Sequence, residues 1–191
     1  MSFGRADGAE KLFAYLEARP QLGADIDQEV EARCLYCDRH HKIEWGGEGP
    51  PPLEPDNDEY MFLPYTLLDS AVFHSDDLRS PGVVETIQLA LLAGATITDR
   101  VRANAGFDVD GCGYEWAANE YLLSACVAPP EQRRASWAAT TLRELAATEP
   151  GEARRAAIHA AFVRDCCGGA FDDDEFRAIV KPVYESARPS K

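Results

Sequence analysis

Long apolar runs and positive charge are what this sequence has least of. The longest apolar stretch, residues 89–97, is about half as long as a helix needs to cross a bilayer, so a membrane span there is excluded. Lysine and arginine number 19 against 33 aspartate and glutamate residues, a formal charge of −14. A surface of this sign repels phosphate backbones and anionic lipids, which disfavours nucleic acid and membranes as partners.

Targeting and catalytic motifs are also missing. The N-terminal residues lack the order of basic, apolar and small residues that marks a secretory signal, so we expect a cytoplasmic protein. Six cysteines in that compartment are more typical of buried thiols, ligands or redox groups than of a disulfide framework. The sequence has no Gly-rich phosphate loop, nucleophile elbow, His-Glu-x-x-His motif or dinucleotide fingerprint. The absence of a complete catalytic set favours a protein without enzymatic activity.

What the sequence does have is acidic charge, concentrated near its N-terminus. Residues 1–80 hold 17 acidic and 7 basic residues, which leaves 16 acidic and 12 basic residues for the rest of the chain. Because such a field steers association toward positive surfaces, we expect a basic protein partner. Asp56, Asp58 and Glu59 are the candidate contact residues. The alternative is that the charge serves solubility alone.

The N-terminal region reads as a helix, a hairpin and a loop. Ala9, Leu12, Phe13 and Leu16 recur at helical spacing, which predicts an amphipathic helix over 8–18. The segments around 29–36 and 41–45 are expected to pair as a short β-hairpin. A stretch rich in proline, glycine and acids then predicts a loop. We therefore expect an N-terminal region over 1–58 and a helical body over 59–191, as two modules or one continuous domain.

The helical body is predicted to contain about five helices, over 83–93, 114–127, 131–147, 151–167 and 173–186. The first should be the central buried helix, with Ser80 as its N-cap and Gly94 at its end, because only Glu85 and Gln88 interrupt its apolar residues. The fold class expected is thus α+β and predominantly α-helical, with the N-terminal helix and hairpin packed on this bundle.

The turn Cys34-Leu-Tyr-Cys37 lies between the two predicted strands and resembles the first knuckle of a zinc ribbon. The resemblance implies that both thiolates bind one zinc ion. A ribbon has a second Cys-x-x-Cys pair about 15–20 residues later, where this chain has its Pro-rich stretch. The remaining ligands would come from other histidines and cysteines: His40 and His41 nearby, or His74, Cys112 and Cys126 farther along. A zinc-binding regulatory module is one alternative function.

Arg154 and His159 match the Arg-x4-His spacing that HEPN ribonucleases carry on a helix of an all-α fold. The resemblance implies a ribonuclease that uses these two residues, although the acidic charge disfavours an RNA substrate. The competing interpretation is a solvated helix face formed by Arg155 and His159, one turn apart, with Glu152.

Three smaller features are interpreted structurally. The acidic run 172–175 should cap the last helix and interact with its dipole. Residues 108–113 resemble the start of an EF-hand but lack the bidentate glutamate, which favours a Gly-rich turn. Of the adjacent Cys166 and Cys167, one is expected near the surface, because neighbours on a helix cannot both point into one core.

The function that these observations favour is non-enzymatic protein binding, as by an immunity protein, an inhibitor or an adaptor acting on a basic partner. Arginine outnumbers lysine fifteen to four and alanine is abundant, which indicates a bacterial source.

Overall fold

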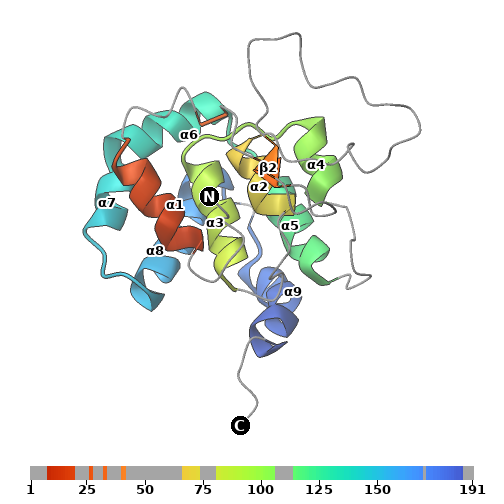
Figure 1. The fold of residues 1–191 in the computed structure, drawn as a ribbon. Coiled ribbons are helices and arrows are strands. Elements are labelled where there is room, and N and C mark those ends of the chain that lie inside the picture. Colours follow the sequence, from red (N-terminus) through yellow and green to blue (C-terminus); the bar gives the residue numbers. More distant parts are fainter. Residues whose placement is uncertain are drawn as a thin grey trace.

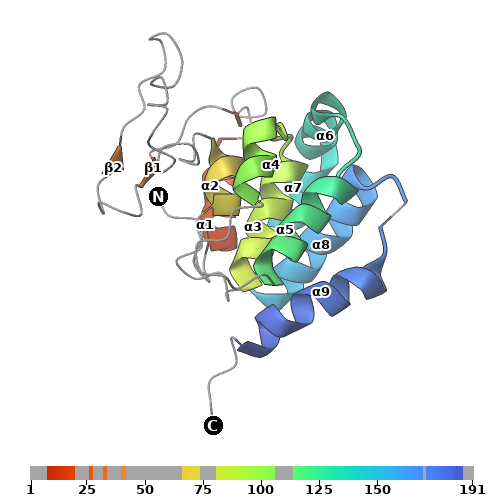
Figure 2. The ribbon, with the colours of Figure 1, turned by 90° about the vertical axis from the view of Figure 1, so that its right-hand side faces the viewer.

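The computed structural model describes residues 8–19, 26–27, 32–33, 40–41, 66–73, 81–105, 114–169 and 171–186. This part of the chain is an assembly of α-helices around one core (Figure 1). Figure 2 shows α3 (Pro81–Leu92), α5 (Tyr114–Ala125) and α8 (Glu152–Cys166) side by side, with α9 (Asp173–Ser186) running across their lower ends.

The N-terminal helix α1 (Gly8–Glu17) confirms the prediction made from apolar spacing. Leu12, Phe13 and Leu16 are at most 2% exposed and face α3, the helix on which α1 packs. Full burial of a leucine or phenylalanine side chain contributes about 1.5–3 kcal/mol, so this face fixes α1 to the core.

The central position of α3 was also predicted correctly. This helix contacts α1, α2 (Leu67–Phe73), α5, α6 (Pro130–Ser136) and α8, and its residues 84–92 are all buried. Gly94, with φ of 94°, ends it in the left-handed conformation that glycine adopts without strain.

Two helices were not predicted: α2 and α4 (Asp99–Ala105). Each begins after a threonine whose hydroxyl oxygen accepts a backbone hydrogen bond three residues later. Thr66 Oγ1 accepts from the Asp69 amide at 3.1 Å, and Thr98 Oγ1 accepts from the Val101 amide at 3.2 Å. Both are therefore N-capped in the ordinary way.

The C-terminal helices lie close to their predicted positions. The helix expected over 131–147 consists of α6, the π-helical turn η3 (Trp137–Thr141) and α7 (Leu142–Ala146). At the start of α9, Asp172 Oδ1 accepts hydrogen bonds from the amides of Asp174 and Glu175, each 3.0 Å long. The acidic run thus caps this helix, as predicted.

The α+β fold class and the predicted β-hairpin are wrong. The only strands among the described residues are β1 (Ala32–Arg33) and β2 (His40–His41), which pair antiparallel and are two residues long each. Pairing this short forms no sheet layer, and an isolated hairpin is marginal in water even when longer. The described fold is α-helical, and the expected boundary between 58 and 59 lies outside the described residues.

Candidate functional site

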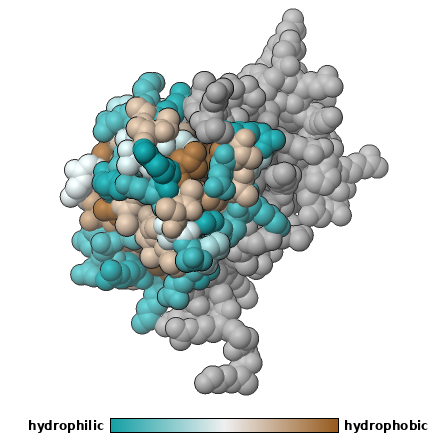
Figure 3. Space-filling model, turned by 90° about the vertical axis from the view of Figure 1, so that its left-hand side faces the viewer, coloured by the Kyte–Doolittle hydropathy of each residue, from teal (hydrophilic) through white to brown (hydrophobic). Residues whose placement is uncertain are grey.

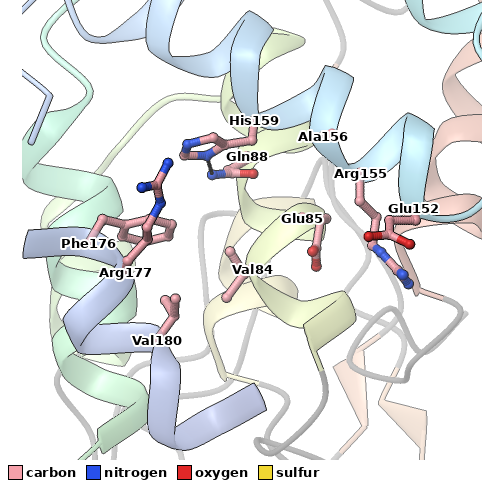
Figure 4. A pocket seen from close by; sticks show the side chains of 10 residues that line it. All are labelled: Val84, Glu85, Gln88, Glu152, Arg155, Ala156, His159, Phe176, Arg177 and Val180. Carbon is pink, nitrogen blue, oxygen red and sulfur yellow. Dashed lines mark hydrogen bonds between the residues drawn. The ribbon is translucent and has the colours of Figure 1, made fainter. Parts of the chain in front are cut away.

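A cavity of about 410 Å³ lies between α3, α8 and α9, and it is the candidate functional site (Figure 4). Its lining combines apolar, acidic, basic and aromatic side chains: Val84, Glu85, Gln88, Glu152, Arg155, Ala156, His159, Phe176, Arg177 and Val180. Helical spacing explains why these residues meet. On α8 they recur at i, i+3, i+4 and i+7, which places them on one face of the helix.

His159 lies on α8 and is held by contacts to the other two helices of the cavity. Gln88 Nε2 on α3 donates to His159 Nδ1 at 3.0 Å, and His159 Nε2 donates to Asp173 Oδ1 on α9 at 2.9 Å. This arrangement assigns the ring proton to Nε2. The imidazole also stacks on Phe176, with ring centroids 5.6 Å apart and planes 9° apart, and meets the edge of Phe171 at 5.4 Å.

The charges of the cavity are arranged by depth. Glu85 is 5% exposed and points into the space between α3, α8 and α9, whereas Glu152, Arg155 and Arg177 are exposed at the rim (Figure 4). Each arginine has a carboxylate near it. Arg177 Nη1 lies 3.6 Å from Asp174 Oδ1, and Glu152 precedes Arg155 by three residues on α8. The deepest charge that an entering group meets is therefore the carboxylate of Glu85.

The cavity combines a partly apolar wall with a few polar side chains. Both nitrogens of His159 are hydrogen-bonded to neighbouring side chains. An apolar wall with a few convergent polar groups is typical of a site that orients a bound group.

Arg154, the second residue of the ribonuclease hypothesis, faces the other side of α8. It is 9% exposed, and its guanidinium donates to Glu10 Oε2 and to the Thr148 carbonyl, each at 2.8 Å, while lying 4.4 Å from the ring centroid of Phe13. These contacts fasten α8 to α1. The structure does not bring Arg154 and His159 together at one surface, because residues five apart on a helix lie on different faces.

The solvated face expected for Arg155, His159 and Glu152 is correct only in part. Arg155 and Glu152 are exposed, but His159 is half-buried in the cavity. Sequence reasoning missed the cavity, although its signal was visible. Glu85 and Gln88 are, besides Thr86, the polar residues of the buried helix α3, and three positions apart they share one of its faces.

The other predicted site residues lie largely beyond what the structure describes. Cys34, Cys37, Asp56, Asp58 and Glu59 are outside the described residues, as are His74, Cys112 and the turn over 108–113. For His40 and His41 only the backbone is described. In the part of the chain that is described, no three histidine, cysteine or acidic side chains are grouped so that they could hold a metal ion. The zinc site at Cys34 and Cys37 stays a prediction.

Comparison of the chain with protein-family models, curated proteins and solved structures found no match. No helix among the described residues is long and apolar enough to span a membrane.

Proposed function

We propose that this protein acts without enzymatic activity by binding a basic protein partner, as an immunity protein, an inhibitor or an adaptor does. We propose further that the cavity between α3, α8 and α9 receives one basic side chain of that partner. The observation that carries this proposal is the buried carboxylate of Glu85 at the inner end of a partly apolar cavity in a protein of charge −14.

The distribution of charge on the helical part supports an acidic binding surface. Several arginines form ion pairs or hydrogen bonds within the protein. Arg134 pairs with Asp27 at 2.8 Å, Arg154 pairs with Glu10, and Arg133 is buried among backbone carbonyls. Exposed acids remain on several helices: Glu17, Glu120, Glu131, Asp173, Asp174 and Glu175. Hydrophilic side chains also cover much of the face drawn in Figure 3, with smaller apolar areas between them.

The cavity suits a lysine or arginine side chain in both of its parts. The apolar stem of such a residue can pack against Val84 and Val180, as long basic side chains commonly do. Its charged end would meet Glu85, where low local polarity strengthens the attraction between opposite charges.

The first experiment tests the cavity directly. Nα-acetyl-arginine amide is titrated into ¹⁵N-labelled protein, and the shifts of the Glu85, Gln88 and His159 resonances are followed. Saturable shifts at these residues that are lost in Glu85→Gln would support the proposal. Equal shifts in Glu85→Gln would overturn the role of the cavity. Glu131→Gln, an equally conservative change at an exposed site on α6, is the matched control.

The second experiment tests the partner. Immobilised protein is exposed to host lysate at moderate salt, and captured proteins are identified and then purified for binding measurements. We expect a basic partner whose Kd rises steeply with salt and rises about tenfold or more in Glu85→Gln, because tenfold corresponds to about 1.4 kcal/mol. Reversing the charges of Asp56, Asp58 and Glu59 should slow association. A partner whose affinity is unchanged by all of these substitutions would contradict the proposal.

A further inference from the structure

Two cysteines from distant parts of the chain meet where α5 and α8 end. Cys126 follows the last residue of α5, and Cys166 is the last residue of α8. The amides of Val127 and Ala128 both donate to the Cys166 carbonyl oxygen, at 2.9 and 3.0 Å. The backbone after Cys126 is thereby fastened to Cys166.

Each thiol shifts the pKa of the other. The Cys166 thiol donates a hydrogen bond to the Cys126 sulfur, which lowers the pKa of Cys126, and the charges of Arg133 and Arg102 lower it further. The same hydrogen bond, together with burial, raises the pKa of Cys166. The pair therefore combines a thiol that ionises readily with a neighbour that stays protonated.

Exposure separates the roles of the cysteines. Cys126 is partly exposed, whereas Cys166 and Cys167 are both fully buried, so the expectation that one of the adjacent pair lies near the surface is wrong. Burial also raises the pKa of Cys167 to about 12. An oxidant arriving from solvent reaches Cys126 first.

We propose that Cys126 and Cys166 are a reversible redox pair that closes to an intramolecular disulfide when the protein meets a peroxide. The backbone hydrogen bonds from Val127 and Ala128 to the Cys166 carbonyl hold the two cysteines next to each other, which is the arrangement that a disulfide requires. Such a bond would link the end of α5 to the end of α8.

The chemistry proceeds in two balanced steps. The Cys126 thiolate attacks one oxygen of hydrogen peroxide, the O–O bond breaks, and the departing hydroxide takes a proton to become water, which leaves Cys126 as a sulfenic acid. Cys166 then attacks the Cys126 sulfur as its proton leaves, the S–S bond forms, and the S–O bond breaks with release of a second water. Two thiols lose two electrons, and one peroxide gains them.

The test maps disulfides in the full-length protein after brief treatment with hydrogen peroxide. Free thiols are alkylated, the protein is digested, and linked peptides are identified by mass spectrometry. We expect a Cys126–Cys166 linkage in monomeric protein that disappears after dithiothreitol. A wild-type map without this linkage, including one in which Cys126 joins Cys167 or another chain, would overturn the proposal. This measurement is made on the wild-type protein, so it does not depend on whether a variant folds.

Variants then separate the two roles. Cys166→Ala should leave Cys126 as a sulfenic acid that dimedone labels, and Cys126→Ser should abolish both the label and the linkage. Cys112→Ser serves as the matched control and should leave the linkage intact. Peroxide should raise the Tm of wild-type protein and of Cys112→Ser, because the bond closes a loop over residues 126–166. An equal rise in Cys126→Ser would contradict the assignment.

Discussion

The imidazole of His159 lies parallel to the ring of Phe176, with centroids 5.6 Å apart, while its two nitrogens contact Gln88 and Asp173. One side chain of α8 thereby joins α3 to α9 at the wall of the cavity. Because this side chain joins two other helices, its removal should change the stability of the fold by a measurable amount.

Replacing His159 by alanine should lower the free energy of unfolding by about 1–3 kcal/mol, because the buried amide of Gln88 loses a partner and Phe176 loses its stacked ring. Urea unfolding followed by circular dichroism measures this change. Arg155→Ala, one turn earlier on the same helix and exposed, should change stability by less than about 0.5 kcal/mol. Equal losses in the two variants would show that the His159 contacts do not hold α9 in place.

A second prediction concerns Arg133, a 2% exposed arginine that donates to three backbone carbonyls. The Leu91 carbonyl belongs to the last turn of α3, where helix carbonyls lack partners within the helix, and Ala95 lies just after that helix. Arg133→Met should therefore cost about 2–4 kcal/mol, because it leaves buried acceptors unsatisfied. Arg133→Lys should recover only part of the loss, since lysine lacks the planar fork of donors. Thermal unfolding of both variants, with exposed Arg143→Met as control, tests this.

The positions of the longer helices could be predicted because their sequences contain both apolar residues at helical spacing and residues that typically end a helix. Leu12, Phe13 and Leu16 mark one face of α1, and Gly94 marks the end of α3. The seven-residue helices α2 and α4 are too short for their period to be recognised. Their threonine N-caps, Thr66 and Thr98, were the available signal.

The polar positions of α3 alone could not predict the cavity itself, because it depends on how three helices cross. Nothing local shows that His159 would meet Gln88, 71 residues earlier in the chain. Likewise, the spacing of Arg154 and His159 indicates a catalytic pair only if both side chains face one surface. In the structure Arg154 pairs with Glu10 of α1, on the other side of α8 from His159. The spacing of two residues along a helix fixes the angle between their side chains. Which residues those side chains contact depends on tertiary packing.

A third prediction follows from Asp165, whose carboxylate accepts hydrogen bonds from Arg164 and Thr141. The Arg164 hydrogen bond, and then that of Thr141, lower the pKa of Asp165 against the opposing effect of burial. A carboxyl with a lowered pKa stabilises the fold above its unfolded pKa of about 3.9, and this contribution is lost as the pH falls further.

Asp165→Asn should accordingly destabilise the protein at pH 7 by about 1 kcal/mol, a modest amount because Arg164 is half exposed and solvent screens the pair. Its deficit relative to wild type should shrink as the pH is lowered from about 5 to 2. Urea unfolding at several pH values measures the difference. Glu149→Gln, an exposed change before α8, provides the comparison, and a deficit of Asp165→Asn that stays constant with pH would refute the assignment.

Gly94 and Gly169 allow backbone strain to be separated from crowding, because both have positive φ, 94° and 84°, in different surroundings. A Cβ at Gly94 would overlap Cγ of Arg134 and lie 3.1 Å from the Pro130 carbonyl oxygen, whereas a Cβ at Gly169 would meet nothing within 4 Å. Arg134 cannot easily move aside, since its guanidinium pairs with Asp27. Gly94→Ala should thus lower the free energy of unfolding by about 2–4 kcal/mol and Gly169→Ala by about 1 kcal/mol. Urea unfolding of the two variants in parallel decides the matter, because similar losses would mean that only the backbone conformation matters at Gly94.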